Sequence, residues 1–393
     1  MNSRPATMAE AAPPPLLGGL PDEIAIWEIL VRLPPKDLLR CRAVCRAWRC
    51  TTSTRDFLLT HHARQPSLPL SYVKNYGGDL FTLDIISFDH QGGAATPQTV
   101  ARLRRHILIP RVSCDGLIVF WIECKAGQQL FICNPATRQY GCLPMLFGGP
   151  LSAVGMPFGA PRPVAVGMYS HSPTGEYRLL LLQKAEAPDG SSLVYTYALG
   201  SSQPPWHLHI EGPNLNELVF SRGPFLFRGS LHWCISNMII VSDTVAESFR
   251  QMRTPVVPNL SDLFEMDGML GMSSFDDYND DELIVDIWMM QDYEHEVWAF
   301  KYRVEIPYAE LTLQFGLFYP RDCVVFTSWV GDVAVLVPFG RWLLQLDVGG
   351  KLVASFEDSG GLIGQPYQLK QTLVQHTFFL TLEGYVVNGS PFI

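Results

Sequence analysis

The sequence predicts a two-part protein, with a small helical module at the N-terminus and a large all-β domain after it. Helical periodicity is confined to the first 66 residues, and from about Leu70 onward short apolar runs alternate with Gly, Pro, Asn and Asp clusters. The chain has 393 residues, of which 47% are hydrophobic and 17% charged. It is therefore long and apolar enough to bury a sizeable core in more than one domain.

The helical module begins with a segment that has more apolar residues than one buried helix face can use. Asp22 and Glu23 occupy its first turn, where carboxylates favour the positive end of the helix dipole. The apolar positions that follow wrap most of the helix: Ile24, Ile26, Trp27, Ile29, Leu30, Val31 and Leu33. Domains below roughly 60 residues bury only about 60% of their surface. The surplus must therefore be covered by the rest of this chain or by a separate protein.

The ordered residues of this module resemble an F-box. They are Leu20-Pro21, Ile29-Leu30, Leu33-Pro34, Leu38 and Val44-Cys45-Arg46-x-Trp48. The resemblance implies a three-helix F-box over residues 20–66 that docks onto the Skp-type adaptor of a cullin–RING ubiquitin ligase; the alternative is an ordinary helical hairpin of the core. We expect ten residues to form the adaptor contact or the module's own core beneath it, two roles that sequence alone does not separate: Leu20, Pro21, Ile24, Leu30, Leu33, Pro34, Leu38, Val44, Cys45 and Trp48.

Charge is unevenly distributed between the two parts. Residues 1–66 carry a net charge of +3 and the remainder −12, for a total of −9. An acidic body repels phosphate backbones, so nucleic acid is not an expected partner. Five arginines of the module form a basic group, which is either a solvated helix face or a patch that steers an acidic partner: Arg40, Arg42, Arg46, Arg49 and Arg55.

The chain is expected to function in the cytoplasm, the nucleus or both. No apolar run approaches the roughly 18 to 20 residues needed to span a bilayer, so no membrane partner is expected. Residues 1–19 are rich in Ala and Pro and predict a disordered leader rather than a signal peptide. Nine cysteines without a Cys-x-x-Cys pair disfavour a disulfide framework and fit a reducing compartment.

Short strands without intervening helices predict a sandwich, barrel or propeller for the rest of the chain. In residues 300–306, apolar Phe300, Tyr302, Val304 and Ile306 alternate with charged residues, as in a strand with one wet face. The other main candidates are residues 117–122, 130–133, 177–183, 193–197, 238–242, 283–289 and 333–337. Glycines 116, 229, 331 and 384, with 167 and 271 as looser members, recur at intervals of 42 to 62 residues. Kelch blades repeat at about 50 residues, so this spacing favours a propeller of six or seven blades.

Local motifs in this region resemble the F-box-associated domain of plant F-box proteins. They include residues 113–117, 132–138, 174–177, 229–233, 242–244 and 285–288. The resemblance implies a kelch-like propeller of six to eight blades over residues 70–393 that recruits a target protein. The Gly- and Pro-rich stretch 144–163 is longer than the family pattern and leaves the blade boundaries there open.

Catalytic, metal-binding and cofactor-binding motifs do not emerge from the sequence. It has no P-loop, no Gly-x-Ser-x-Gly elbow and no Gly-x-Gly-x-x-Gly turn. His61 and His62 are expected to be solvated at a helix end, and the acidic cluster from Asp276 to Glu282 to be a solvated turn. Trp233, after His232, is expected to fill the space between stacked blades.

These inferences together predict a non-catalytic subunit of a Skp–cullin–F-box E3 ubiquitin ligase. The F-box would bind the adaptor, and through it a cullin, while the β domain would recruit an unidentified protein substrate for ubiquitination. Two alternatives stay open: a scaffold that acts outside ubiquitin transfer, and a propeller that binds a small ligand. A propeller enzyme would need convergent polar groups around its axis, which sequence cannot show.

Overall fold

The computed structural model describes most of the chain and divides it into two compact units. The described residues are 21–74, 80–86, 97–104, 109–124, 127–144, 164–184, 192–208, 215, 217–218, 223–235, 237–256, 260–279, 282–318, 320, 323–327, 333–357 and 367–393. The helical unit comprises Met1–Gln65 with Thr372–Val374, and the β unit comprises Pro66–Gln371 with Gln375–Ile393. The expected leader, residues 1–19, lies outside the described residues, as does Leu20.

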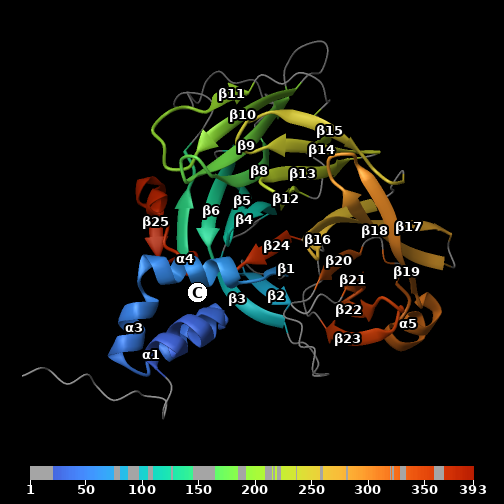
Figure 1. Ribbon diagram of the computed structural model, residues 1–393, viewed down its shortest axis with the longest axis horizontal. Coiled ribbons are helices and arrows are strands. Elements are labelled where there is room, and N and C mark those ends of the chain that lie inside the picture. The colour runs from blue at the N-terminus through green and yellow to red at the C-terminus, as the bar shows by residue number, and fades with distance from the viewer. Residues whose placement is uncertain are drawn as a thin grey trace, which may run out of the picture. The chain divides into compact units, whose positions relative to one another are not determined.

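The helical unit contains one composite helical stretch and three α-helices (Figure 1). The first stretch runs through α1 (Asp22–Ile24), the π-helix η1 (Ala25–Ile29) and the 3-10 helix η2 (Leu30–Arg32). Leu33 is extended, because the residue before a proline is disfavoured in the α region. The α-helices are α2 (Pro35–Cys41), α3 (Arg46–Thr52) and α4 (Arg55–Arg64). The unit therefore has more helical segments than the three that the family resemblance implied.

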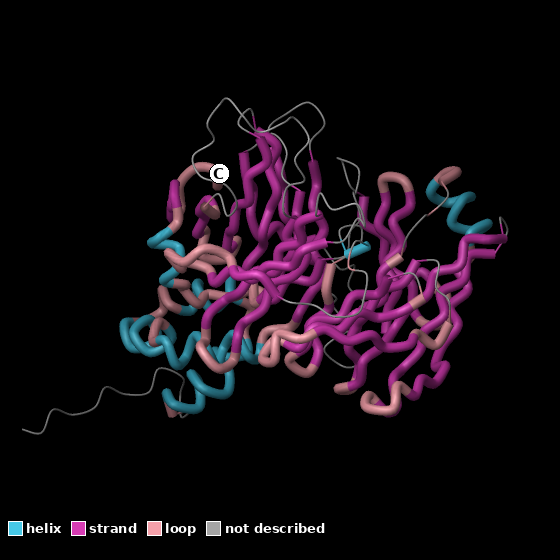
Figure 2. Tube along the Cα trace, turned by 90° about the horizontal axis from the view of Figure 1, so that it is seen from above, coloured by secondary structure: helices cyan, strands magenta, loops and turns pink. Residues whose placement is uncertain are grey.

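The β unit consists almost entirely of antiparallel strands, drawn in magenta in Figure 2. Its strands form six sheets, and the described residues supply five of them with four strands and the sixth with five. The first ten strands are β1 (Ser67–Lys74), β2 (Leu80–Ile86), β3 (Pro97–Arg104), β4 (Ile109–Cys114), β5 (Leu117–Cys124), β6 (Gly127–Asn134), β7 (Gln139–Cys142), β8 (Val164–His171), β9 (Glu176–Lys184) and β10 (Ser192–Ala198).

The next eight strands are β11 (Trp206–Leu208), β12 (Phe225–Phe227), β13 (Ser230–Ile235), β14 (Met238–Asp243), β15 (Phe249–Arg253), β16 (Leu260–Met266), β17 (Met269–Asn279) and β18 (Glu282–Asp292). The last seven are β19 (Val297–Ile306), β20 (Val324–Thr327), β21 (Val333–Phe339), β22 (Trp342–Asp347), β23 (Leu352–Glu357), β24 (Tyr367–Lys370) and β25 (Glu383–Val387). Helix α5 (Tyr308–Phe315) connects β19 to β20, and the 3-10 helix η4 (Thr377–Thr381) precedes β25.

This arrangement is propeller-like, with five regular four-stranded blades. Four of them are built from consecutive strands: β8 to β11, β12 to β15, β16 to β19, and β20 to β23. The fifth has the order β24-β1-β2-β3, and the five-stranded sheet has the order β25-β7-β6-β5-β4. The expected range of six to eight blades exceeds the five regular four-stranded blades. The glycine spacing counted Gly384 as the start of a further blade, but Gly384 lies in β25, which joins the sheet of β4 to β7.

The C-terminal segment closes the β unit at two places. β24 pairs with β1, so the last part of the chain completes the sheet that its first strands begin. β25 then pairs with β7 at the outer edge of the five-stranded sheet. The final residues continue along β3, where the Arg104 N–H donates to the Pro391 carbonyl over 2.8 Å and the Ile393 N–H donates to the Arg102 carbonyl over 3.1 Å. Pairing between chain ends holds a ring of sheets closed.

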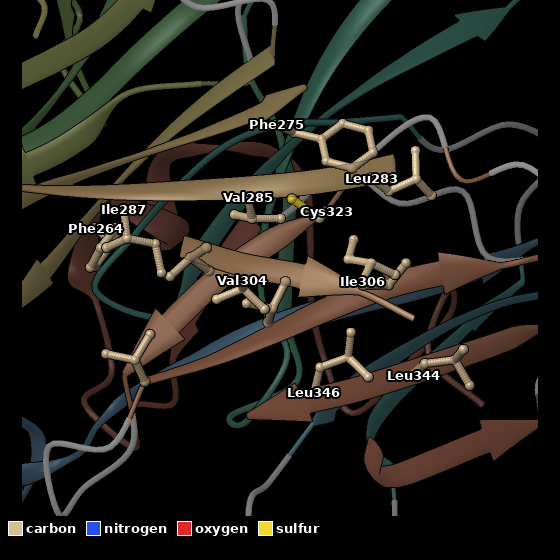
Figure 3. Close-up of a cluster of buried hydrophobic side chains, with 14 of the residues drawn as sticks. Phe264, Phe275, Leu283, Val285, Ile287, Val304, Ile306, Cys323, Leu344 and Leu346 are labelled. Atoms are coloured by element: carbon tan, nitrogen blue, oxygen red, sulfur yellow. The ribbon is translucent and has the colours of Figure 1, made fainter. Parts of the chain in front are cut away.

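The core of the β unit lies between neighbouring sheets. The largest cluster joins β16–β19 to β20–β23, and Figure 3 shows its side chains interleaved between the strands. Another cluster holds Trp233 of β13, which is fully buried and donates its indole N–H to the Val166 carbonyl of β8 over 2.9 Å. The expectation that Trp233 fills the space between blades is confirmed.

Two families of tight turns repeat around the β unit. Asp115-Gly116, Arg228-Gly229 and Asp267-Gly268 link the first two strands of three sheets, with positive φ at both positions as type I′ hairpins require. Turns between the third and fourth strands begin with an Asx side chain that accepts backbone N–H groups: Asn134, Asp243, Asp292 and Asp347.

The glycine repeat expected from the sequence is only partly correct. Gly116 and Gly229 occupy equivalent turns, but Gly268, not Gly271, is the corresponding residue of β16–β17. Gly167 and Gly384 lie within β8 and β25, and Gly331 lies outside the described residues. Glycine alone is an incomplete marker because it is selected by positive φ in turns and by close packing in strands.

Candidate functional site

The helical unit keeps a group of large apolar side chains in contact with solvent. Ile24, Trp27 and Ile29 on the first stretch are exposed, and so are Leu39 of α2, Val44 before α3 and Leu59 of α4. Val44 is the most exposed of them at 61%. Single exposed apolar residues are common on protein surfaces, but six large ones on so short a unit are more than folding alone explains and are typical of units that bind a partner.

The ten residues expected to contact an adaptor fall into three groups. Pro21, Ile24, Pro34 and Val44 are exposed, and Leu33 and Cys45 are partly exposed. Leu30, Leu38 and Trp48 are buried, together with Ile26, Val31 and Phe57. Leu20 lies outside the described residues. The motif therefore combines surface residues with residues whose side chains are out of reach of a partner unless the unit rearranges.

The segment around Cys45 shows how the buried residues shape the exposed ones. Cys45 caps α3, its Sγ accepting the Trp48 backbone N–H over 3.4 Å. The Thr52 hydroxyl donates to the Trp48 carbonyl over 2.6 Å, and the Arg42 guanidinium donates to Thr52 Oγ1 over 3.1 Å. The first two bonds fix the cap and the end of α3, and the Arg42 bond joins α3 to the residue that ends α2. Val44 is thereby presented at a defined position instead of on a fraying turn.

His61 joins the first stretch to α4 and is not the solvated residue that its place near a helix end suggested. It is fully buried, and its Nε2 lies 2.8 Å from the Leu33 carbonyl. Leu33 is extended, and its carbonyl accepts from the imidazole N–H and also from the Gln65 side-chain amide over 3.2 Å. Burial lowers the pKa of His61, and the charge of Arg42 lowers it further, against the raising effect of the Leu33 bond. Neutral His61 is therefore the form that fits the fold.

The arginine group of the helical unit is mostly solvated. Arg40 pairs with Asp37 over 3.0 Å on α2, and Arg42 is partly buried in its bonds to Thr52. Arg46, Arg49 and Arg55 are exposed and form no ion pair within the described residues. The exposed residues that follow α2 therefore include both apolar Val44 and the cations Arg46, Arg49 and Arg55. Such a combination suits an acidic partner with apolar contact residues.

The β unit has no comparable chemical centre in its described part. No group of three or more His, Cys, Asp or Glu side chains there could hold a metal ion. His232 is buried between Phe227 and Tyr293, and its Nε2 lies 2.7 Å from the Tyr293 hydroxyl. Burial lowers the pKa of His232 to about 4, so it is a neutral acceptor for the tyrosine hydroxyl. This contact joins two sheets.

An ionic contact joins another pair of sheets. Glu247, in the turn before β15, accepts from the Tyr169 hydroxyl over 2.9 Å and from the Arg178 guanidinium over 2.7 Å. Arg178 also lies over the Trp206 ring, 5.1 Å from its centroid. Sequence reasoning missed this cluster, whose only signal is the Asp243-to-Glu247 turn, because its residues are far apart in the chain.

No helix within the described residues is long and apolar enough to span a bilayer.

Comparisons with known proteins match both units. An F-box-like family model matches residues 17–64. Over 298 residues the chain is 26% identical to the F-box protein At5g49610 of Arabidopsis thaliana, covering 71% of this chain and 77% of that protein. It is 26% identical to the F-box protein CPR1 over 319 residues, covering 71% and 72%, and 24% identical to the F-box/LRR-repeat/kelch-repeat protein At1g09650 over 250 residues, covering 60% and 64%; both are from the same plant. A Bacteroides caccae protein of unknown function has a similar structure at a TM-score of 0.36 and 11% identity, covering 75% of this chain and 97% of that one.

Proposed function

Because this chain carries an F-box-like domain at its N-terminus and is related along most of its length to Arabidopsis F-box proteins, we propose that it is the substrate-recognition subunit of a Skp–cullin–F-box ubiquitin ligase. The helical unit binds a Skp-type adaptor and, through it, a cullin. The β unit holds a target protein near the ubiquitin-charged enzyme. The chain itself supplies no catalytic group and acts in the cytoplasm or nucleus.

The exposed apolar surface of the helical unit is the observation that supports this proposal most directly. Pro21, Ile24, Pro34 and Val44 belong to the motif and remain in contact with solvent. We assign them to the adaptor contact, with Leu20, Leu33 and Cys45 beside them. The buried members of the motif form the core that supports this surface: Leu30, Leu38 and Trp48. Tethering a target in this way raises its effective concentration at the transfer site without any chemistry by the receptor.

Val44→Asp tests the adaptor contact without disturbing the core, since Val44 is exposed and a charge at buried Leu30 would unfold the unit. Desolvating an unpaired carboxylate in an interface is expected to cost about 2 kcal/mol or more, a loss of roughly 30-fold in affinity for the purified adaptor. Val353→Asp is the matched control, because Val353 is a valine of similar exposure in β23. Equal adaptor affinity for both variants would refute the proposal.

Ubiquitin transfer is tested separately in cells. A receptor that recruits targets for degradation is expected to leave them at higher levels when Val44→Asp replaces the wild-type chain. The Val353→Asp variant is expected to restore normal turnover. Loss of adaptor binding with unchanged levels of every bound protein would favour a scaffold outside ubiquitin transfer.

A further inference from the structure

A short apolar ridge stands out on the β unit at α5. Leu313 is 89% exposed and Leu317 is 86% exposed, more than any other large apolar side chain of the described residues. Phe318 follows them and is also exposed. Figure 1 shows α5 at the edge of the β unit, beside β22 and β23. We name the surface formed by Leu313, Leu317 and Phe318 the α5 ridge.

The α5 ridge is held by the core beneath it and is not a loose connection. Leu311 is buried, and the rings of Tyr308 and Phe315 pack against Phe339 and Trp342 at centroid distances of 6.2 and 5.2 Å. The Gly316 N–H donates the last helical bond to the Thr312 carbonyl over 3.0 Å. Gly316 then takes a φ of +93°, which turns the chain out of the helix. The two leucines are thus presented on either side of a fixed corner.

Phe318 ties the far side of this corner to the same core. Its ring lies 5.7 Å from that of Phe339, so the segment after Gly316 is anchored as well as the helix before it. A ridge anchored at both ends loses little conformational freedom when it binds. Leu313 and Leu317 are so exposed that their apolar area adds little to the core, and folding alone does not account for them.

The size and charge of the ridge favour one kind of binding partner. Three side chains supply on the order of a few hundred Å². A stable dimer of this chain through the ridge would need to bury roughly 1,200 to 2,000 Å². A weak, transient contact with another protein buries less than about 1,200 Å², which fits the size of the ridge better. Glu310 is exposed in α5 three residues before Leu313, a spacing that puts the two on neighbouring parts of one helix face. Its carboxylate forms no ion pair within the described residues, whereas Arg341 is neutralised by Glu357 at 2.9 Å. Residues 67–393 also carry a net charge of −12.

We propose that the α5 ridge is a docking site for the recruited target, and that it takes an apolar segment flanked by lysine or arginine. The inference rests on the proposed function of the β unit as the part that recruits a target. An amphipathic helix with a basic polar face fits best, because its apolar stripe covers Leu313 and Leu317 while its cations face Glu310.

The test measures binding of synthetic peptides to the full-length protein by fluorescence anisotropy. The probe is a short helix-forming peptide with leucines on one face and lysines on the other; its controls replace the lysines by glutamate or the leucines by serine. Binding by the lysine peptide alone is expected. The double variant Leu313→Ser/Leu317→Ser is expected to weaken it about tenfold or more, as loss of interface anchors does. Leu380→Ser, which alters an exposed leucine in η4, is expected to leave it unchanged.

Charge reversal and amide exchange provide independent readouts. Glu310→Lys is expected to shift preference toward the glutamate peptide. On wild-type protein, the lysine peptide is expected to slow hydrogen exchange in residues 308–318, a result that needs no variant to fold. Equal peptide affinity of the double serine variant, or protection confined to other residues, would overturn the proposal. Two other results would also overturn the proposal: dimerisation of the protein at rising concentration, or flotation of the protein with phosphatidylserine vesicles, if the double variant abolishes either one.

Failure of this inference can be told apart from failure of the proposed function. The double serine variant is expected to bind the purified adaptor as the wild type does, since the ridge belongs to the β unit. Unchanged adaptor affinity of Val44→Asp would refute the ligase role and leave peptide binding by the ridge intact. If the lysine peptide does not bind but Val44→Asp weakens adaptor binding as expected, the docking site on the ridge is refuted and the adaptor contact stands.

Discussion

Replacing Trp233 by phenylalanine tests how neighbouring sheets of the β unit are joined. Val166 is the extra residue of a β-bulge between Ala165 and Gly167, so its carbonyl is taken out of the ladder with β9. The Trp233 indole N–H supplies the missing bond over 2.9 Å. Phenylalanine cannot donate, and leaving a buried carbonyl without a partner costs about 1–3 kcal/mol. The smaller ring also leaves a void, which brings the expected loss to about 3 kcal/mol.

Thermal unfolding followed by circular dichroism measures this loss. At about 2 °C or more per kcal/mol for a domain of this size, Trp233→Phe is expected to lower Tm by roughly 6 °C. Trp342→Phe is the matched control, since Trp342 is only partly buried and its indole N–H makes no hydrogen bond within the described residues. The control is expected to cost less than about 1 kcal/mol. Equal shifts for the two variants would show that the inter-sheet bond does not stabilise the fold.

Three further perturbations test the fold. The pKa of His232 is about 4 in the folded chain against 6.5 for a free imidazole, so the unfolded chain binds the proton first and stability falls as pH drops from 6.5 toward 4. At about 1.4 kcal/mol per pKa unit, the free energy of unfolding measured in urea is expected to be about 2 kcal/mol lower at pH 5 than at pH 7. The His232→Gln variant is expected to lack this loss, and the same pH dependence of stability in both proteins would contradict the prediction. Gly271→Ala places a methyl 2.5 Å from the Phe264 ring and is expected to cost about 1–3 kcal/mol by urea unfolding, whereas an unchanged midpoint would mean the ring moves freely. Deleting residues 388–393 removes buried Phe392 and two backbone bonds to β3, so faster hydrogen exchange in residues 97–104 is expected, and unaltered exchange would show that the tail does not hold that edge.

The strand predictions succeeded where the pattern was local. Residues 300–306 form the end of β19, with Val304 and Ile306 buried and Arg303 and Glu305 exposed, as a period of two requires. Phe300 departs from this pattern and is 48% exposed, where a register shift between β18 and β19 interrupts the alternation. The other strand candidates also lie within β5, β6, β9, β10, β14, β18 and β21. Each depends on neighbours a few residues away, which the sequence displays directly.

Predictions failed where a distant partner decides the environment. His61 is adjacent to His62 near a helix end, yet it is buried and donates to the carbonyl of Leu33, 28 residues earlier in the chain. The glycine repeat missed Gly268 because only the turn conformation separates it from Gly271, three residues later. Glu247, Arg178, Tyr169 and Trp206 meet from four places in the chain, and no spacing rule links them.

The sequence by itself determined the order of the two parts, the class of each and the motif that relates the first to F-boxes. These depend on periodicity and on residues close together in the chain, which act through short-range sterics and hydrogen bonds. Only the tertiary structure decided which apolar residues are buried and which stay outside. Leu30 and Ile24 are equally apolar members of one motif, but burial is the sum of contacts made by the whole fold, so one supports the surface and the other forms it.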